Sequence, residues 1–297
     1  MPLLNFKNLI PHLALFGANA IYAVNYSVAK DVMPDYIQPF GFILLRCLGA
    51  LSLFWLVQQI FFRESIERED IPRLALCGLF GVALNQLTFF SGLNITSPIN
   101  AAIIMTSNPV LVLIAGSLIL KNRITIQKIV GISLGIFGAC MIILFRGNFQ
   151  LDTSTWMGDL LVFINAMSYG VYLVLVKSLM HKYSPITVIK WVFTFGFVFV
   201  LPFGWNQFHA IEWHTFTLNI ALKTAFVVVC TTFFAYLLNT IGLKKLQPTT
   251  VSTYIYTQPV LASLFAISMG KDELDVIKII SAILIFSGVF LVSRKFS

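Results

Sequence analysis

Charged residues are scarce in this sequence. They make up 11% of its 297 residues, whereas a typical soluble domain carries about 25%. Hydrophobic residues make up 58%, and the mean hydropathy is +0.87. The sequence also lacks the glycine-rich phosphate-binding loop of ATP-hydrolysing proteins, and none of its polar segments is long enough for a separate domain. We therefore expect an integral membrane protein that does not hydrolyse ATP.

Cysteine is scarce too. The four cysteines all lie in apolar runs without a close pair: Cys47, Cys77, Cys140 and Cys230. This arrangement favours small buried side chains over disulfides or metal ligands. His209, Glu212 and His214 share one short polar segment, but two histidines five residues apart are a weak zinc signal, and a solvated loop is the preferred interpretation. We therefore predict neither a metal site nor a cofactor.

Ten long apolar runs dominate the chain. A run of about twenty residues spans the hydrocarbon core of a bilayer, and such a run must be helical because lipid offers no partner to a free backbone amide. The predicted helices cover roughly residues 8–29, 39–61, 71–93, 97–120, 126–146, 156–180, 186–207, 219–243, 248–270 and 275–293. The predicted fold is therefore an all-α integral membrane protein with ten transmembrane helices.

Lys and Arg are distributed unevenly among the segments between these helices. If the N-terminus is cytoplasmic, thirteen of the twenty fall in cytoplasmic segments and five in segments on the other side, while Arg46 and Lys190 lie within helices. Both termini are therefore predicted to be cytoplasmic, in a bacterial inner membrane or plasma membrane. The net charge of +8 is interpreted as a topology signal and not as a nucleic-acid-binding surface.

The sequence repeats itself at an offset of 150 residues. The segment "TSNPVLVLIAG" at 106–116 matches "YTQPVLASLFA" at 256–266. Other aligned pairs are Gly92 with Gly242, Pro98 with Pro248, Lys121 with Lys271 and Gly138 with Gly288. Each half holds five helices, an odd number, so the second half enters the membrane from the opposite side. We predict two inverted repeats, residues 1–148 and 149–297, with a substrate site near the membrane midplane between them.

A weaker match relates the first helix to the sixth. "AIYAVNYSVAKDVM" at 20–33 resembles "MSYGVYLVLVKSLM" at 167–180. With Arg46 early in the second helix and a proline-containing helix before Lys121 and Lys271, the chain resembles the EamA-type ten-helix family of the drug/metabolite transporter superfamily over nearly its whole length. The resemblance implies a carrier of a small metabolite, commonly an exporter, and not an enzyme. The family often has Trp where this chain has Tyr22 and Tyr169.

Polar side chains inside the helices outline a candidate substrate cavity of amides and phenols. Any one of them is more often a helix-to-helix hydrogen bond, but their concentration on a few helices favours a pocket. The predicted substrate-binding residues are Asn19, Tyr22, Asn25, Arg46, Asn85, Gln86, Asn108, Asn165, Tyr169, Tyr172, Tyr236, Tyr254, Tyr256 and Gln258. Thr88 and Asn239 are further polar groups of the same helices.

Arg46 sets the predicted charge of the substrate. It lies about 10 Å below the outer end of its helix, and no acid lies at comparable depth. A guanidinium suits a carboxylate, so a small carboxylate-bearing metabolite such as an amino acid is favoured. The alternative is that Arg46 binds backbone carbonyls or lipid headgroups at the outer rim. Lys190 is close enough to the cytoplasmic end of its helix to extend to the membrane surface.

Pro109 and Pro259 are predicted hinges. Neither can donate an amide hydrogen to the carbonyl four residues earlier, so each helix gains a free carbonyl and a kink. Asn108 and Gln258 could serve the freed groups or contact a substrate. The fifth and tenth helices carry glycines and few polar side chains, which assigns them to packing or to a homodimer face.

The sequence says little about how transport would be driven. Proton coupling usually needs an acid within the membrane, and the only candidate is Asp159 near the outer end of the sixth helix, where a solvated cap is the preferred role. Transport driven by a substrate gradient or by exchange is therefore favoured. The alternatives are a non-transporting membrane receptor or accessory protein, and a carrier of a cationic drug-like or nucleobase-like compound.

Cysteine labelling tests the orientation. Single cysteines at 63–70 and 121–125 are expected to react with an impermeant reagent only from the cytoplasm, because positively charged segments stay on that side. Cysteines at 94–97 and 209–214 are expected to react only from outside. Labelling from the opposite sides would contradict the predicted topology.

Overall fold

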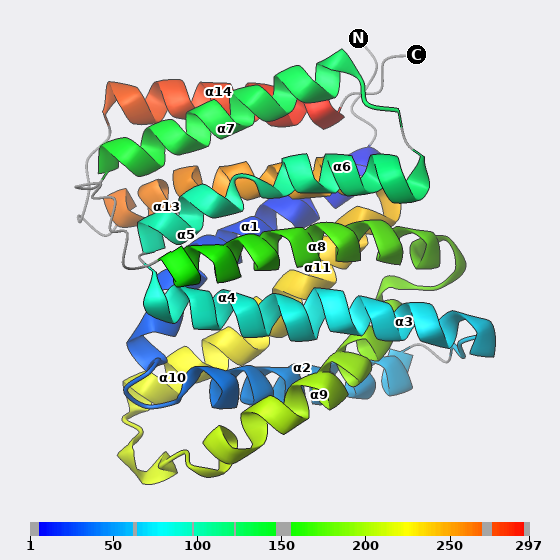
Figure 1. Cartoon of the computed structure of the whole chain (residues 1–297), viewed down its shortest axis with the longest axis vertical. Helices are drawn as coiled ribbons and strands as arrows, with labels where there is room; N and C mark the ends of the chain where they lie inside the picture. Colours follow the sequence, from blue (N-terminus) through cyan, green and yellow to red (C-terminus); the bar gives the residue numbers. More distant parts are fainter. Residues whose placement is uncertain are drawn as a thin grey trace.

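The computed structural model describes residues 6–61, 64–96, 98–121, 123–146, 156–268 and 275–293, and the regular elements in these ranges are all helical (Figure 1). In chain order they are α1 Phe6–Val32, α2 Pro39–Phe61, η1 Arg68–Asp70, α3 Ile71–Gly78, η2 Leu79–Ala83, α4 Leu84–Ile95, α5 Pro98–Met105, α6 Asn108–Leu120, α7 Ile126–Arg146, α8 Trp156–Lys182, α9 Pro185–His209, η4 Trp213–Thr215, α10 Leu218–Phe226, η5 Val227–Phe234, α11 Ala235–Lys245, α12 Pro248–Thr253, η6 Tyr254–Tyr256, α13 Thr257–Ser268 and α14 Val276–Ser293.

The predicted ten-helix arrangement is confirmed. Eight of the stretches are long and apolar enough to cross a membrane. The first and ninth predicted helices are α1 and the run α12–η6–α13, which complete the ten. Several predicted helices are built from shorter elements in line, such as α3–η2–α4 and α10–η5–α11. The predicted boundary between the halves, at 148 and 149, lies outside the described residues.

Equivalent helices of the two halves pack against each other in two places. α2 lies along α9, and α7 lies along α14, at opposite edges of the molecule (Figure 1). A Cβ atom on Gly131 would lie 2.9 Å from the carbonyl oxygen of Gly288, and one on Gly138 would lie 2.8 Å from that of Ser281. These four positions form two pairs 150 residues apart, so the contact is nearly symmetric. Small residues allow such close approach of membrane helices.

The glycines of α7 and α14 therefore serve packing within the chain. Most side chains that these two helices turn outward are large and apolar, Phe137 and Phe290 among them. A homodimer through α7 and α14 remains a prediction, and it would have to use these outward faces.

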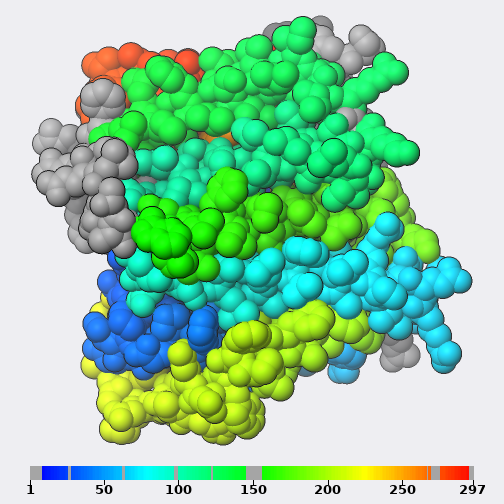
Figure 2. Space-filling model, viewed as in Figure 1, coloured from blue at the N-terminus to red at the C-terminus, as the bar shows by residue number. Residues whose placement is uncertain are grey.

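The first helix of each half packs mainly against the other half. α1 lies against α11 and α13, while α8 lies against α4 and α6. Figure 2 shows α6, α8 and α4 as successive rows on one face of the molecule. This exchange interlocks the halves and brings polar residues of both around the same central space.

The proline-containing helices are broken, not merely kinked. The fourth predicted helix divides at Thr106 and Ser107 into α5 and α6, and the ninth passes through the short 3₁₀ turn η6. Both breaks lie just before the proline, because its ring clashes with the carbonyl four residues earlier. The third and eighth predicted helices contain the π-helical segments η2 and η5 at equivalent positions. These segments were not predicted from the sequence, and such segments often mark functional sites.

Replacing Gly138 by Val tests the α7–α14 contact. The added side chain would overlap Ser281 and Ile285, and overpacking of this kind costs roughly 1–3 kcal/mol. The melting temperature of purified protein is expected to fall by on the order of 5 °C. Ser133→Val on the exposed face of the same helix is the matched control and should melt like the parent. Equal effects of the two substitutions would contradict the assigned contact.

Candidate functional site

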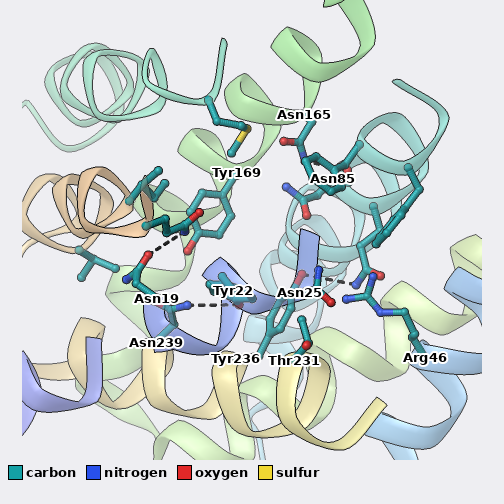
Figure 3. A pocket seen from close by; sticks show the side chains of 17 residues that line it. Asn19, Tyr22, Asn25, Arg46, Asn85, Asn165, Tyr169, Thr231, Tyr236 and Asn239 are labelled. Carbon is teal, nitrogen blue, oxygen red and sulfur yellow. Dashed lines mark hydrogen bonds between the residues drawn. The ribbon is translucent and has the colours of Figure 1, made fainter. Parts of the chain in front are cut away.

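A polar cavity of about 110 Å³ lies between the two halves (Figure 3). Ten of the fourteen predicted residues line it: Asn19, Tyr22, Asn25, Arg46, Asn85, Gln86, Asn165, Tyr169, Tyr236 and Gln258. Asn239 also lines it. Because the lining comes from elements of both halves, a relative movement of the halves would change the shape of the cavity.

Arg46 is a buried cation that lies against the cavity. It is 3% exposed, and its Nε donates a hydrogen bond of 3.0 Å to Thr232 Oγ1, which in turn donates one of 2.8 Å to the carbonyl of Val227. The guanidinium carbon lies 4.6 Å from the ring centroid of Phe90 and 5.9 Å from that of Phe42.

The charge of Arg46 is not balanced within the protein. Among the residues that the structure describes, no carboxylate forms an ion pair with it, and its Nη1 has no hydrogen-bond partner. Cation–π contacts are worth about 0.5–2 kcal/mol each, whereas burying a charge costs several kcal/mol. An anion in the cavity would supply the missing stabilisation.

Three amide oxygens in the cavity lining also lack hydrogen-bond partners within the described part of the chain. They are Asn25 Oδ1, Gln86 Oε1 and Asn165 Oδ1, all buried. The amide nitrogens of Gln86 and Asn165 are occupied, because Gln86 donates to the Tyr236 hydroxyl at 3.4 Å and Asn165 to the carbonyl of Asn85 at 2.8 Å. The cavity therefore combines one free cationic donor group with several free acceptors.

The pseudo-symmetry axis passes through the cavity lining. Gln86 and Tyr236 stand 150 residues apart and bond to each other, as do Thr106 and Tyr256. Bonds between equivalent residues require that the two positions meet near the axis. The predicted location of a site between the inverted halves agrees with this geometry.

The amides that precede the two prolines donate hydrogen bonds to equivalent positions, Ala166 and Asn19, but to different kinds of acceptor. Asn108 donates to the carbonyl of Ala166 at 2.7 Å, and Gln258 donates to Asn19 Oδ1 at 2.8 Å. Ala166 and Asn19 are 147 residues apart, the same offset as Tyr22 and Tyr169. Asn108 is fully buried, whereas Gln258 and Asn19 line the cavity. Only the second bond is therefore within reach of a ligand in the cavity.

Four predicted substrate-binding residues lie outside this lining. Asn108 holds α8, as described above. Tyr256 donates to the carbonyl of Thr106, where the fourth helix breaks, at 3.0 Å. The hydroxyl of Tyr254 shares a 2.6 Å hydrogen bond with His12 Nδ1, and the ring of Tyr172 packs over Gly81. Neither pre-proline amide serves the carbonyl that its proline frees, at Met105 or Ile255, because Asn108 and Gln258 donate to Ala166 and Asn19. The phenol of Tyr256 serves a different carbonyl at the break, that of Thr106.

Six lining residues were not predicted: Phe89, Phe90, Met105, Thr231, Val251 and Ile255. They are mostly apolar, so a search for polar groups within the membrane passes over them. Phe89 and Phe90 nevertheless lie one helical turn after Asn85 and Gln86 on the same helix, and this spacing indicates a shared face.

Two further expectations need revision. The ammonium of Lys190 does not extend to the surface: the residue is 4% exposed, and its Nζ lies 4.1 and 5.0 Å from the ring centroids of Trp55 and Trp191. The cation–π contacts hold it between α2 and α9. Asp159 is not a freely solvated cap, because its carboxylate accepts a 2.5 Å hydrogen bond from the Thr96 hydroxyl.

Comparisons with known proteins agree with this architecture. The profile of the EamA-like transporter family matches residues 9–144 and 156–294. An uncharacterized transporter of Archaeoglobus fulgidus is 25% identical over 96% of this chain and 97% of its own, and the uncharacterized transporter YyaM of Bacillus subtilis is 24% identical over 97% and 94%. A probable terminal-alkyne amino-acid exporter of Streptantibioticus cattleyicolor is 23% identical over 76% and 74%. One solved crystal structure superposes with a TM-score of 0.75 at 17% identity, covering 95% of both chains, which shows a common fold.

Removing the Tyr256 hydroxyl tests its structural role. Tyr256→Phe leaves the Thr106 carbonyl without this buried partner, which costs about 1–3 kcal/mol, and thermal unfolding is expected at a lower temperature. Tyr169→Phe is the matched control because no bond of the Tyr169 hydroxyl is found within the described chain, and its effect should be small. If the two variants melt together, Tyr256 does not support the helix break.

Proposed function

This chain belongs to the EamA-like transporter family, and we propose that it exports a small metabolite that carries a carboxylate, with an amino acid as the best fit. The observation that carries this proposal is the uncompensated guanidinium of Arg46 at the cavity. The family and the apolar helices establish that the chain is a multi-pass membrane transporter. The position of Arg46 at a cavity within the helices is consistent with this function.

The charge of the site favours an anionic group on the cargo. Arg46 remains protonated, and its planar donors suit a carboxylate. A cationic cargo would bring a second positive charge next to a buried one. Tyr22, Tyr169 and Tyr236 offer aromatic rings that could contact a cation, but they do not offset the repulsion from the guanidinium.

The free amide oxygens favour a second, donating group on the same molecule. An α-ammonium can donate to Asn25, Gln86 or Asn165 while the carboxylate meets Arg46. A cavity of about 110 Å³ is also small beside the roughly 300–1,000 Å³ that drug-sized ligands occupy. A small zwitterion satisfies both the charge and the size, and the printed name of the exporter from Streptantibioticus cattleyicolor supports the same class of cargo.

Transport follows from the inverted halves. Exchange of the two halves' conformations opens a central site to alternate sides of the membrane. The breaks before Pro109 and Pro259 lie beside the cavity and provide hinges for this exchange. The distribution of Lys and Arg supports cytoplasmic termini, which places Arg46 in the outer half of the membrane.

The proposal is tested by ligand binding to the parent protein and to Arg46→Gln. Amino acids are first screened by thermal shift, and the best ligand is then compared with its amide, which lacks the carboxylate, and with its deamino acid, which lacks the ammonium. For L-leucine these probes are L-leucinamide and 4-methylpentanoate. The amino acid is expected to bind best to the parent, and Arg46→Gln is expected to raise its Kd roughly 10- to 100-fold, since a hydrogen bond to a charged group is worth about 1.5–3 kcal/mol.

Lys190→Gln is the matched control for this experiment. It removes the other buried cation within the helices, which lies against Trp55 and Trp191 and not in the cavity lining. Its Kd should equal that of the parent. Tighter binding of the amide than of the amino acid, or an unchanged Kd in Arg46→Gln, would contradict the proposal.

A further inference from the structure

Two polar links hold the ends of α1 and α8, two helices that line the cavity, to helices of the opposite half. Lys223 Nζ of α10 donates to Asp31 Oδ2 of α1 at 2.6 Å. Arg73 Nη1 of α3 donates to Ser178 Oγ of α8 at 2.9 Å. Each link joins the first helix of one half to the third helix of the other, so both bridge the interface that must move during transport.

The two links occupy equivalent positions in the inverted halves. Arg73 and Lys223 are 150 residues apart, and Asp31 and Ser178 are 147 apart. These are the offsets that relate the corresponding helices elsewhere, as in Gln86 with Tyr236 and Tyr22 with Tyr169. Because the halves are inverted, equivalent positions near helix ends lie at opposite ends of the bundle.

Both links lie beyond the cavity along their helices. Asp31 follows the lining residue Asn25 by six positions, or about 9 Å at 1.5 Å per residue, and Lys223 precedes Thr231 by eight positions, or about 12 Å. At the other end, Ser178 follows Tyr169 by nine positions, or about 13 Å. A link at each of these places holds together the helices between which a path to the cavity would open.

The end that holds Arg73 and Ser178 carries additional bonds. Lys182 Nζ lies 2.9 Å from both Glu67 Oε2 and Asp70 Oδ2, and the hydroxyl of Tyr183 donates to Asp70 at 2.8 Å. This network joins the start of α3 to the end of α8 in the same way as Arg73 and Ser178 do. Several polar contacts must therefore break together before this end opens.

Two more polar contacts lie at the same end, although neither spans α3 and α8. Lys177 Nζ donates to the carbonyls of Leu243 and Leu246 at 2.6 and 2.7 Å, which ties α8 to the end of α11. Glu64 accepts a 2.9 Å hydrogen bond from the backbone amide of Ser184, just before α9. Partial burial opposes ionisation of Glu64, but hydrogen bonds from Thr187 and Ser184 outweigh it and lower its pKa, so the carboxylate stays charged at neutral pH.

At the opposite end, one ion pair links α1 to α10 within the described part of the chain. The side chains of Asp31 and Lys223 are 53% and 28% exposed, and those of Lys182 and Asp70 are 48% and 12% exposed. Pairs this accessible contribute about 0–1 kcal/mol each, so the two ends differ in the number of their contacts. Gln207 accepts hydrogen bonds from the amides of Phe40 and Gly41 at the Asp31 end, but this joins α9 to α2 and does not span the α1–α10 contact.

We propose that Asp31–Lys223 and the Arg73–Ser178 and Lys182–Asp70 contacts are the two gates of the cavity, and that the single ion pair Asp31–Lys223 is the weaker one. This inference rests on the proposed transport function. The cavity then opens more readily at the Asp31 end, which the orientation proposed above places outside the cell. One ion pair controls access there, whereas a network holds the cytoplasmic end shut.

The experiment measures access to the cavity from each side of the membrane. A cysteine at the lining residue Ile255 reports access, in a background with Cys140→Ser and Cys230→Ser, and the impermeant reagent MTSET is applied to whole cells or to inverted vesicles. Lys223→Met is expected to raise the labelling rate up to about fivefold from the outside alone, the factor that 1 kcal/mol corresponds to. Arg73→Met combined with Lys182→Met is expected to raise it from the cytoplasmic side alone.

Two control variants distinguish the loss of the gate contact from the effect of removing any positive charge and from a general disturbance of the fold. Lys278→Met breaks the ion pair of Lys278 with Asp275 at the start of α14 and should leave both rates unchanged. The exchanged pair Asp31→Lys with Lys223→Asp should return the outside rate toward that of the parent. The labelling rate of the same background without a cysteine at position 255 is subtracted from each measured rate.

The outcomes distinguish the gates from the proposed cargo. If Lys223→Met changes neither rate or both alike, or if the exchanged pair labels like Lys223→Met, the gate is disproved. If the two variants open opposite sides in the reverse order, the gates stand and the membrane orientation is reversed. Since access is measured without any substrate, failure of amino acids to bind leaves this result unaffected and bears on the proposed function alone.

Discussion

In the function that we propose, the buried guanidinium of Arg46 is the constraint on which the rest depends. A single hydrogen bond to Thr232 and the faces of two phenylalanines hold it in place, and among the described residues no carboxylate balances it. These contacts fix its position but return only part of the free energy lost on leaving water. A ligand that brings a negative charge would complete the site, and one that brings a positive charge would worsen the imbalance.

The two halves of the structure are related by pseudo-symmetry about the cavity that Arg46 lines. Equivalent helices pack as pairs, equivalent residues bond across the axis, and equivalent links lie at the two ends of the bundle. Arg46 breaks the symmetry. With the 147-residue offset that also relates Gly49 to Gly196, its counterpart is Phe193, which is fully buried against the rings of Phe54 and Tyr236. The frame that alternating access would need is thus common to both halves, while the charge that we propose selects the cargo lies in the first half.

Much of the frame could be predicted from sequence because its causes are local or repetitive. Twenty-residue apolar runs require helices, and the fixed 150-residue offset reveals the repeat. The polar residues of the cavity were also accessible to this reasoning, since amides and cations within the membrane are costly and must face protein or water.

The remaining features depend on partners that a linear sequence does not reveal. Tyr256 and Tyr169 are both tyrosines within helices, yet one serves the Thr106 carbonyl and the other lines the cavity. The position of Lys190 depends on Trp55, which lies far away in the chain. The π-helical segments arise without a proline or another local signal, so only the folded chain shows that Thr232 is turned toward Arg46.

An experimental structure of the protein with a bound amino acid would test the central claim most directly. The account predicts that the carboxylate lies within hydrogen-bond distance of Arg46 Nη1, and that the ammonium lies among the amide oxygens of Asn25, Gln86 and Asn165. A ligand whose carboxylate lies away from Arg46, or whose cationic group points at it, would contradict the account.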